Sequence, residues 1–283
     1  MPPLRKLFVL GRVSNVPTVW SNCLAGWWLA GAGNPEKLPL LLIGTTFLYV
    51  GGMYLNDVFD AEFDHLHRPQ RPIPSGTVSE RAVWRLGLLW LALGAACLMG
   101  LGDVTGSLGL ALTLCIVIYN AVHKPFVFSP VLMGLCRFFV YVVAASIGIY
   151  GVTGWAIWCG LALAVYVAGL SFLARRESQR GQWPQWPMVL LGAPILLALL
   201  MNSGGYFQAA LLLSVVLGLW VVRCLRLAFW SVQRKAGRAV AGLLAGIVLV
   251  DLLAVADAPG RFSLVFLVLF AVTLILQRFV PAT

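Results

Sequence analysis

Four of the ten acidic residues of this chain fall within one stretch, NDVFDAEFD, at positions 56–64. At about 100° per residue on a helix, Asp57, Asp60 and Asp64 lie within about 60° of one another, and Asn56 widens that arc to about 100°. Glu62 points to the opposite side. Carboxylates on one face repel one another unless a cation lies between them, and such oxygen ligands suit Mg²⁺ bridged to phosphate. The stretch therefore predicts a magnesium and phosphate site.

The next segment, HLHRPQRPIPSG, brings cationic side chains close to these carboxylates. Its alternating prolines stiffen the chain, so Arg68 and Arg71 are expected directly behind the acidic stretch, where a guanidinium group could bind phosphate through two hydrogen bonds. The alternative is a solvated helix end whose arginines only mark membrane topology. A position at a membrane boundary favours the site, because ionisable residues held there usually serve a function.

The composition indicates that the lipid bilayer is the solvent of this chain. Of 283 residues, 60% are hydrophobic and 11% are charged, and the mean hydropathy is +0.91. A bilayer crossing needs about 20 apolar residues. Apolar segments of about that length recur at 17–33, 38–55, 82–101, 105–121, 130–150, 153–173, 188–203, 207–229, 237–255 and 262–280. We predict an all-α, polytopic transmembrane helical bundle of nine to ten helices in one domain, residues 1–283, in which 188–203 could be re-entrant.

The distribution of Lys and Arg predicts the orientation of the bundle. Seventeen of the twenty fall at one set of alternate segment ends, whereas only Lys37 and Arg261 fall in the opposite loops and Arg137 lies inside a segment. Basic residues in short loops are retained on the cytoplasmic side. The acidic stretch and both termini are therefore expected on the cytoplasmic face of a bacterial inner membrane. The net charge of +10 is explained by topology and by anionic lipid and substrate, without nucleic acid.

Other functional patterns are weak. The six cysteines stand singly in apolar runs and are expected to be packing residues. The first twelve residues are basic and apolar without a cleavage site, which predicts an interfacial helix rather than a removable signal. No Ser/His/Asp or Cys/His pairing has a spacing that favours nucleophilic catalysis.

Three motifs carry a family resemblance. NDVFDAEFD followed by RPQRPIPSG resembles the UbiA superfamily of intramembrane prenyltransferases, whose first signature is NDxxDxxxD followed by an RPxRP-type turn. LGRVSNVPTVWSNCLAGWWLAG is similar to the first helix of that family, and YNAVHKPF resembles its Tyr-x-x-x-Lys region. The resemblance implies a UbiA-like prenyltransferase fold that binds an isoprenyl diphosphate donor through Mg²⁺. It also implies transfer of the prenyl group to an aromatic or quinone-precursor acceptor within the membrane.

The resemblance also implies roles for individual residues. Asn56, Asp57, Asp60 and Asp64 match the metal signature, and the three aspartates together with Lys124 are the implied catalytic residues. His123 holds the place four positions after the tyrosine of the motif and Lys124 the place five positions after it, so either side chain could face the site. Arg137 matches a position near the acceptor, although a buried structural role is an equal alternative. The implied substrate-binding residues are Asn56, Arg68, Arg71, Tyr119, His123, Arg137, Arg175 and Arg176.

The second signature of the family departs from its usual form. Where relatives carry an Asp-rich DxxxD motif, this chain reads LARRESQRG, with Glu177 as the single carboxylate. Glu177 could ligate one Mg²⁺, or Arg175 and Arg176 could contact phosphate in place of a second ion. The ending is similar to that of the EboC-like branch. It favours an alternative function, a noncatalytic carrier or scaffold for isoprenoid diphosphates. A small transporter fits less well, because the charges cluster at one face.

Overall fold

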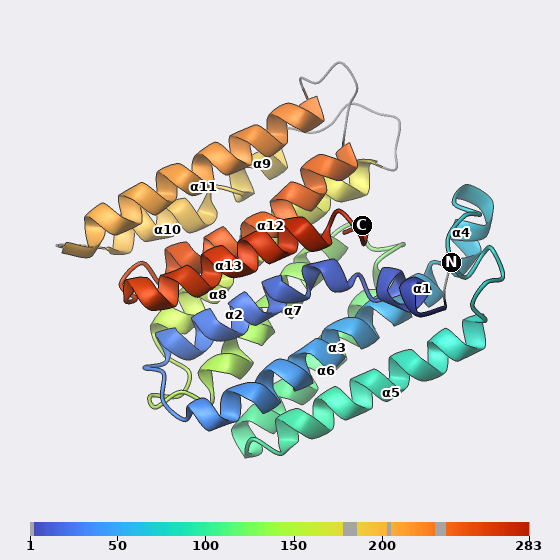
Figure 1. Ribbon diagram of the computed structural model, residues 1–283, viewed down its shortest axis with the longest axis horizontal. Coiled ribbons are helices and arrows are strands. Elements are labelled where there is room, and N and C mark those ends of the chain that lie inside the picture. Colours follow the sequence, from blue (N-terminus) through green and yellow to red (C-terminus); the bar gives the residue numbers. More distant parts are fainter. Residues whose placement is uncertain (1–2, 178–185, 203–204, 230–235, 283) are drawn as a thin grey trace.

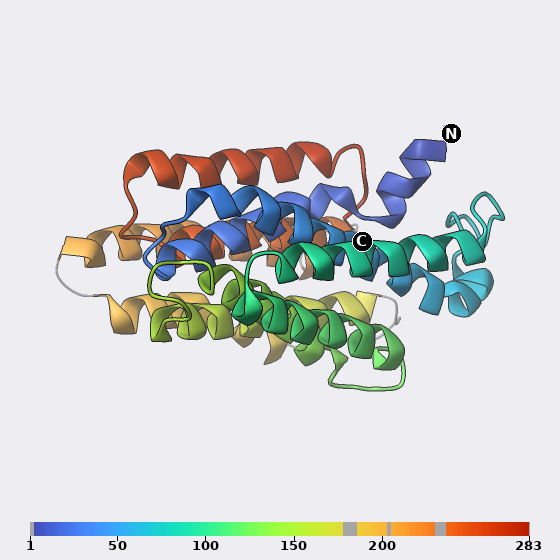
Figure 2. The same ribbon diagram turned by 90° about the horizontal axis from the view of Figure 1, so that it is seen from below.

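The computed structural model describes residues 3–177, 186–202, 205–229 and 236–282, and these form an all-helical bundle without strands (Figure 1). The helices run along one long axis in both views, and the two termini lie toward the end that carries α4 (Figures 1 and 2). In chain order, the elements are α1 (Pro3–Leu10), η1 (Val13–Asn15), α2 (Val16–Leu29), η2 (Pro35–Lys37), α3 (Leu38–Phe59), α4 (Ala61–His67), α5 (Glu80–Met99), α6 (Asp103–Val122), α7 (Ser129–Ala145), α8 (Gly154–Glu177), α9 (Trp186–Leu190), α10 (Ala193–Met201), α11 (Gly205–Phe229), α12 (Ala236–Ala254) and α13 (Gly260–Leu276). Each predicted apolar segment is therefore helical.

Six helices in the described part of the chain are long and apolar enough to cross a membrane: α3 with η2, α5, α6, α8, α11 and α12. The predicted number of nine to ten is not matched. The helices α2, α7 and α13 have only 14, 17 and 17 residues, which at about 1.5 Å per residue is shorter than a hydrocarbon core of about 30 Å. Segment 188–203 is broken between Leu190 and Ala193, and Pro194 in the first turn of α10 cannot donate a backbone hydrogen bond.

Glycines let α3 and α5 pack with their backbones in contact. A Cβ atom on Gly51 would lie 2.9 Å from the carbonyl oxygen of Gly87, and one on Gly94 would lie 2.8 Å from that of Gly44. Such distances leave no room for a side chain, as is typical where small residues line a helix interface in a membrane. The close packing fixes α3, whose C-terminal end carries the acidic stretch.

The core of the other half of the bundle surrounds α2. Gly26 of α2 lies against the backbone of α7, where its Cβ would be 2.5 Å from the Tyr141 carbonyl oxygen. Figure 1 shows α12 and α13 beside α2. Large fully buried side chains such as Leu163, Tyr166 and Phe266 fill the space between these helices. All six cysteines are free and each is buried or half-buried, as expected for packing residues.

Candidate functional site

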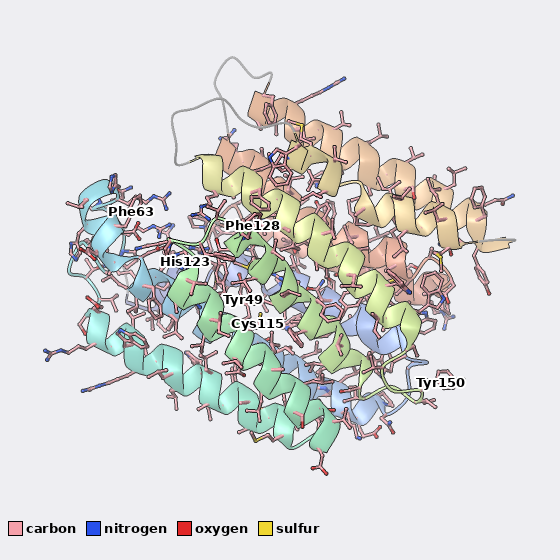
Figure 3. The ribbon with its side chains drawn as sticks, turned by 180° about the vertical axis from the view of Figure 1, so that it is seen from behind. Tyr49, Phe63, Cys115, His123, Phe128 and Tyr150 are labelled. Carbon is pink, nitrogen blue, oxygen red and sulfur yellow. The ribbon has the colours of Figure 1, made fainter. Side chains whose placement is uncertain are left out.

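The acidic stretch lies where α3 meets α4. We expected one continuous helix, but α3 ends at Phe59 and α4 begins at Ala61. Helical hydrogen bonding nevertheless crosses the junction, since the Asp60 amide donates to the Asn56 carbonyl at 2.9 Å and the Asp64 amide donates to the Asp60 carbonyl at 2.9 Å. The three aspartates therefore keep the spacing of successive helical turns. Figure 3 places this end of the molecule near Phe63 and His123.

Arg71 joins two of the carboxylates. Its Nη1 atom lies 2.7 Å from Asp64 Oδ2 and 3.5 Å from Asp57 Oδ1. Both aspartates are buried, with 8% of Asp57 and 2% of Asp64 exposed. Asp57 and Asp64 thus share one cation, Arg71, as predicted for a common face, whereas Asp60, the third predicted member of that face, contacts other cations. Arg68 caps α4, where its amide donates to the Asp64 carbonyl at 2.8 Å.

A second arginine, Arg12, reaches the same carboxylates from the segment between α1 and η1. Its Nη2 atom donates to Asn56 Oδ1 at 3.2 Å and lies 3.5 Å from Asp57 Oδ1. Tyr49 donates a hydrogen bond to the Arg12 carbonyl at 3.3 Å. Sequence reasoning missed Arg12 because it lies 44 residues before Asn56 and was interpreted as a topology marker. Its position inside the first-helix motif LGRVSN was the available signal.

The third carboxylate, Asp60, faces α6 instead. His123 Nε2 lies 2.9 Å from Asp60 Oδ1, and Lys124 Nζ lies 3.3 Å from the same oxygen. Burial by itself would raise the pKa of Asp60, but the hydrogen bond and charge of His123 together with Lys124 outweigh burial and hold this pKa below its ordinary value. The sequence left open whether His123 or Lys124 faces the acidic stretch, and both side chains do.

The His123 ring is fixed on its other side as well. Its Nδ1 atom lies 2.9 Å from the Asn120 carbonyl oxygen, and its ring stacks on Tyr119 at a centroid distance of 5.5 Å. The ring is thus held from both sides, with Nε2 toward Asp60 and Nδ1 toward the Asn120 carbonyl oxygen. His123 therefore contacts both the Tyr119 ring and the Asp60 carboxylate.

Arg137 lies deeper in the bundle than the carboxylates. It lines a cavity of about 70 Å³ between α3, α6 and α7, together with Tyr49 and Tyr119. Its guanidinium group lies 5.6 Å from the centroid of the Tyr49 ring, a distance at which a cation is attracted to an aromatic face. Arg137 makes none of the ion pairs that the described residues form with the acidic stretch.

A buried polar network holds Arg137 in place. Arg137 Nη1 donates to Asn22 Oδ1 at 2.8 Å, and Asn22 Nδ2 donates to Asp251 Oδ2 at 2.7 Å. Asp251 is fully buried, and it also accepts hydrogen bonds from Ser21 at 2.5 Å and Tyr141 at 2.6 Å. The network connects α2, α7 and α12, and its two charged residues, Arg137 and Asp251, both lie inside apolar segments of the sequence.

Arg175 contacts a loop rather than the carboxylates. It donates to the carbonyl oxygens of Lys124 at 2.8 Å and Phe126 at 2.7 Å, and to Ser129 Oγ at 3.0 Å. These bonds hold the segment that carries His123 and Lys124, so Arg175 orders that segment in this structure. The side chains of Arg176 and Glu177 lie outside the described residues.

The described residues bring no group of three His, Cys, Asp or Glu side chains close enough to hold a metal ion. Each of the three aspartates Asp57, Asp60 and Asp64 instead faces cationic side chains. The donor chemistry still fits Mg²⁺, because the ligand atoms are all oxygen and Asp64 Oδ1 is a buried acceptor without a hydrogen-bond partner among the described residues. The residues that would hold the ion are Asn56, Asp57, Asp60 and Asp64.

Curated relatives match part of the chain. It is 32% identical over 104 residues to the digeranylgeranylglyceryl phosphate synthase of Methanosarcina mazei, covering 34% of this chain and 36% of that protein. It is 28% identical over 171 residues to the protein of the same name from Methanoregula boonei, covering 60% and 59%. The chain thus spans between about a third and three fifths of the length of these relatives.

Solved structures match the fold over most of the chain. A digeranylgeranylglyceryl phosphate synthase structure has a TM-score of 0.63 at 18% identity, covering 90% of this chain and 98% of that one. A UbiA homologue from Aeropyrum pernix has a TM-score of 0.67 at 17% identity, covering 85% and 97%. A UbiA homologue from Archaeoglobus fulgidus bound to Cd²⁺ has a TM-score of 0.51 at 13% identity, covering 97% and 99%. At these identities the likeness establishes the fold alone.

The family comparison decides the identity. Residues 16–228 match the UbiA prenyltransferase family, a range that contains the acidic stretch, Arg71, Tyr119, Arg137 and Arg175. The match concerns the family, and the EboC-like branch stays a prediction. Together with the six apolar helices, it identifies the chain as a multi-pass membrane protein that belongs to the UbiA prenyltransferase family.

Proposed function

We propose that this protein transfers a prenyl group from an isoprenyl diphosphate to an acceptor inside the membrane. The observation that carries the proposal is the acidic stretch, whose buried carboxylates meet Arg12, Arg71, His123 and Lys124 at one end of an apolar bundle. Such a site offers both oxygen ligands for a cation and cationic donors for a diphosphate. The apolar interior suits the prenyl chain.

The cationic side chains would bind the diphosphate. In the structure, Arg71 and Arg12 neutralise Asp57, and Arg71 also neutralises Asp64. Arginine binds phosphate oxygens at least as well as carboxylate oxygens, so the arrival of a diphosphate allows both guanidinium groups to exchange partners. When bound to the acidic stretch, Mg²⁺ would supply positive charge that stabilises the departing diphosphate. A UbiA homologue of similar fold is bound to Cd²⁺, which supports the proposal that a divalent ion takes part.

The reaction then needs little covalent chemistry from the protein. The allylic carbon–oxygen bond breaks, and its electron pair leaves with the diphosphate. The acceptor nucleophile forms the new bond to that carbon and loses its proton. Lys124 and the two arginines stabilise the charge on the leaving group, and Tyr49 and Tyr119 line the neighbouring cavity, where their rings would shield a developing allylic cation by about 2 kcal/mol.

Two acceptor classes fit this proposal. The name shared by the relatives, digeranylgeranylglyceryl phosphate synthase, favours a phosphorylated glyceryl lipid as the acceptor. The superfamily resemblance implies an aromatic or quinone precursor instead. Parallel assays with both acceptors, with geranylgeranyl diphosphate as the donor, separate the classes by the mass of the prenylated product.

The alternative is a noncatalytic carrier or scaffold that binds an isoprenoid diphosphate for a membrane-docked pathway. The single carboxylate in LARRESQRG favours it, because a weakened second signature would support binding better than ionisation. The test is a single-turnover assay in nanodiscs with radiolabelled geranylgeranyl diphosphate, Mg²⁺ and an acceptor. Release of diphosphate together with a prenylated product supports the enzyme, whereas saturable binding with neither supports the carrier.

The cellular setting follows from the charge pattern. The predicted retention of basic loops supports an acidic stretch at the cytoplasmic face, and the recurrence of apolar segments along the chain supports one integral domain over 1–283. The relatives named above are archaeal, so the bacterial inner membrane is proposed from the sequence alone. Proteolysis of sealed inside-out and right-side-out vesicles, with cleavage sites engineered in the loop between α4 and α5, tests the orientation.

A further inference from the structure

A pocket of about 620 Å³ opens at the end of the bundle opposite the acidic stretch. It lies between the C-terminal ends of α2, α10 and α12 and the N-terminal ends of α8 and α11. Tyr150, which lines it, marks this end in Figure 3, far from Phe63 and His123. The pocket is therefore separate from the proposed donor site, and its size is that of a small-molecule site.

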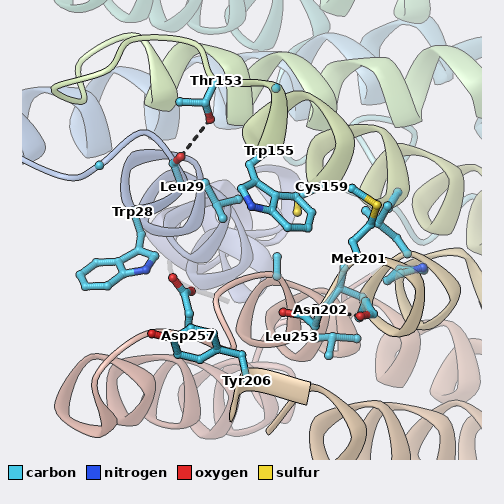
Figure 4. Close-up of a pocket in the computed structure, with 18 of the residues that line it drawn as sticks. Trp28, Leu29, Thr153, Trp155, Cys159, Met201, Asn202, Tyr206, Leu253 and Asp257 are labelled. Atoms are coloured by element: carbon cyan, nitrogen blue, oxygen red, sulfur yellow. Dashed lines mark hydrogen bonds between the residues drawn. The ribbon is translucent and has the colours of Figure 1, made fainter. Parts of the chain in front are cut away.

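The mouth of the pocket is preorganised. The Tyr150 amide donates to the Ala30 carbonyl at 3.0 Å, and Thr153 Oγ1 donates to the Leu29 carbonyl at 2.9 Å, as drawn in Figure 4. Gly31 has a φ of 82°, and a Cβ atom there would collide with the Tyr150 ring. Glycine both adopts this backbone conformation and leaves room for the ring. The loops after α2 and α7 thus form one fixed rim.

The lining combines aromatic rings with one negative charge. Figure 4 shows Trp28, Asp257 and Tyr206 together at one end of the pocket and Trp155 nearer the other. Among the described residues that line the pocket, Asp257 is the only charged one. It is exposed, and within the described part of the chain it forms no ion pair. An unpaired carboxylate beside aromatic faces attracts a cation.

We propose that this pocket binds one lipid-like amphiphile whose headgroup carries an ammonium group. The ammonium would lie between Asp257 and the faces of Trp28 and Tyr206, because aromatic faces and a carboxylate attract the same charge. Leu197 and Leu253 line the apolar part of the pocket and would contact the hydrocarbon chain. An anionic headgroup is disfavoured, because Asp257 repels it.

The competing explanation is an ordinary aromatic belt. Tryptophan and tyrosine gather at membrane interfaces without binding any particular lipid. In that case bulk lipid fills the pocket, and the headgroup makes no difference to its affinity. Headgroup selectivity, and its dependence on Asp257, therefore distinguishes the two explanations.

The test is native mass spectrometry of the purified full-length protein, titrated with phosphatidylethanolamine or phosphatidylglycerol that carry identical acyl chains. We expect the wild-type protein to bind phosphatidylethanolamine about tenfold more tightly. Asp257→Asn should remove this preference. Asp103→Asn is the matched control, because it removes an exposed carboxylate at the first residue of α6, outside the residues that line the pocket, and it should keep the preference.

A second variant tests the aromatic component. Tyr206→Leu should weaken phosphatidylethanolamine binding about fivefold and leave phosphatidylglycerol binding nearly unchanged, because it removes an aromatic face beside Asp257. Equal binding of the two lipids by the wild-type protein, or an unchanged preference in Asp257→Asn, would overturn the proposal. The readout requires neither a prenyl donor nor turnover, so its failure is distinguishable from failure of the proposed function.

Discussion

The buried aspartates of this molecule have two different kinds of partner. At the junction of α3 and α4, the aspartates pair with arginine, histidine and lysine side chains that are themselves between 14% and 38% exposed. Around Asp251, every partner named above is a neutral donor within the bundle. Partly exposed cations can exchange one anion for another. If a buried neutral donor moved away, Asp251 would be left as a buried carboxylate with an unsatisfied oxygen. The aspartates at the α3–α4 junction, called the exchangeable cluster below, can therefore give up their cationic partners to another anion. Asp251 and its donors, the rigid cluster, hold the helices in place.

The largest expected effect lies in the exchangeable cluster. Asp57→Asn keeps the size of the side chain but removes the charge that Arg12 and Arg71 contact. We expect turnover to fall about 100- to 1,000-fold with little change in melting temperature. Steady-state assays in nanodiscs measure the first quantity, and a thermal melt of the same sample measures the second.

Glu62→Gln is the control for that substitution, because Glu62 is an exposed acidic residue on the same segment and was predicted to point away from the site. Its turnover should stay within about twofold of wild type, since exposed charges contribute little. A loss of turnover in Glu62→Gln as large as that in Asp57→Asn would mean that the site is not specific to one helix face.

The rigid cluster should respond through stability. Asp251→Leu leaves Ser21, Asn22 and Tyr141 without their acceptor, and we expect a loss of about 3 kcal/mol in the free energy of unfolding. Asp251→Asn keeps an acceptor oxygen, so its free energy of unfolding should fall by less than that of Asp251→Leu. Unfolding in mixed micelles monitored by circular dichroism gives both values. Equal stability in all three proteins would contradict the structural role.

A smaller effect is expected at Arg12. Arg12→Gln removes the hydrogen bonds to Asn56 and Asp57 and one guanidinium group that would bind phosphate, so the KM for the donor should rise about tenfold. Arg12→Lys keeps the charge but cannot form bidentate hydrogen bonds, so its KM for the donor should lie between those of Arg12→Gln and wild type. A KM that is unchanged in Arg12→Gln would remove Arg12 from the site.

The smallest effect concerns pH. Because the pKa of Asp60 is held below its ordinary value of 3.8, its ion pairs stabilise the protein at neutral pH, and that stabilisation is lost only as pH falls through the lowered value. Asp60→Asn should therefore lower the melting temperature equally at pH 5 and pH 7. If the melting temperatures of Asp60→Asn and wild type differed at pH 7 but not at pH 5, Asp60 would already be protonated at pH 5.

Features of the site that depend on neighbouring residues could be predicted from the sequence. The acidic stretch, Arg71 and the choice between His123 and Lys124 follow from spacing along a few turns of helix. Arg12 and Asp251 could not be predicted in the same way, because their partners are distant in the sequence. Folding brings Arg12 to the C-terminal end of α3, and the packing of α2 against α7 and α12 brings Asp251 to its partners. Arg175 was placed on phosphate by resemblance, although in this structure it binds the backbone of the loop after α6.

Helix positions were easier to predict than helix lengths. Each apolar segment coincides with a helix, but apolarity does not report where hydrogen bonding ends. Segment 130–150 stops being helical after Ala145, and segment 188–203 is interrupted before Pro194. The break at Asp60 was missed for the same reason, since the sequence on both sides of it favours a helix.

Equilibrium binding tests the central claim most directly. The protein in nanodiscs is titrated with a non-hydrolysable geranylgeranyl diphosphate analogue, with Mg²⁺ or with chelator, in wild type and in Asp64→Asn. We predict saturable binding that requires Mg²⁺ and that weakens at least about tenfold in the variant, because the substitution removes a buried carboxylate ligand. Binding of equal strength with chelator, or in Asp64→Asn, would contradict the account.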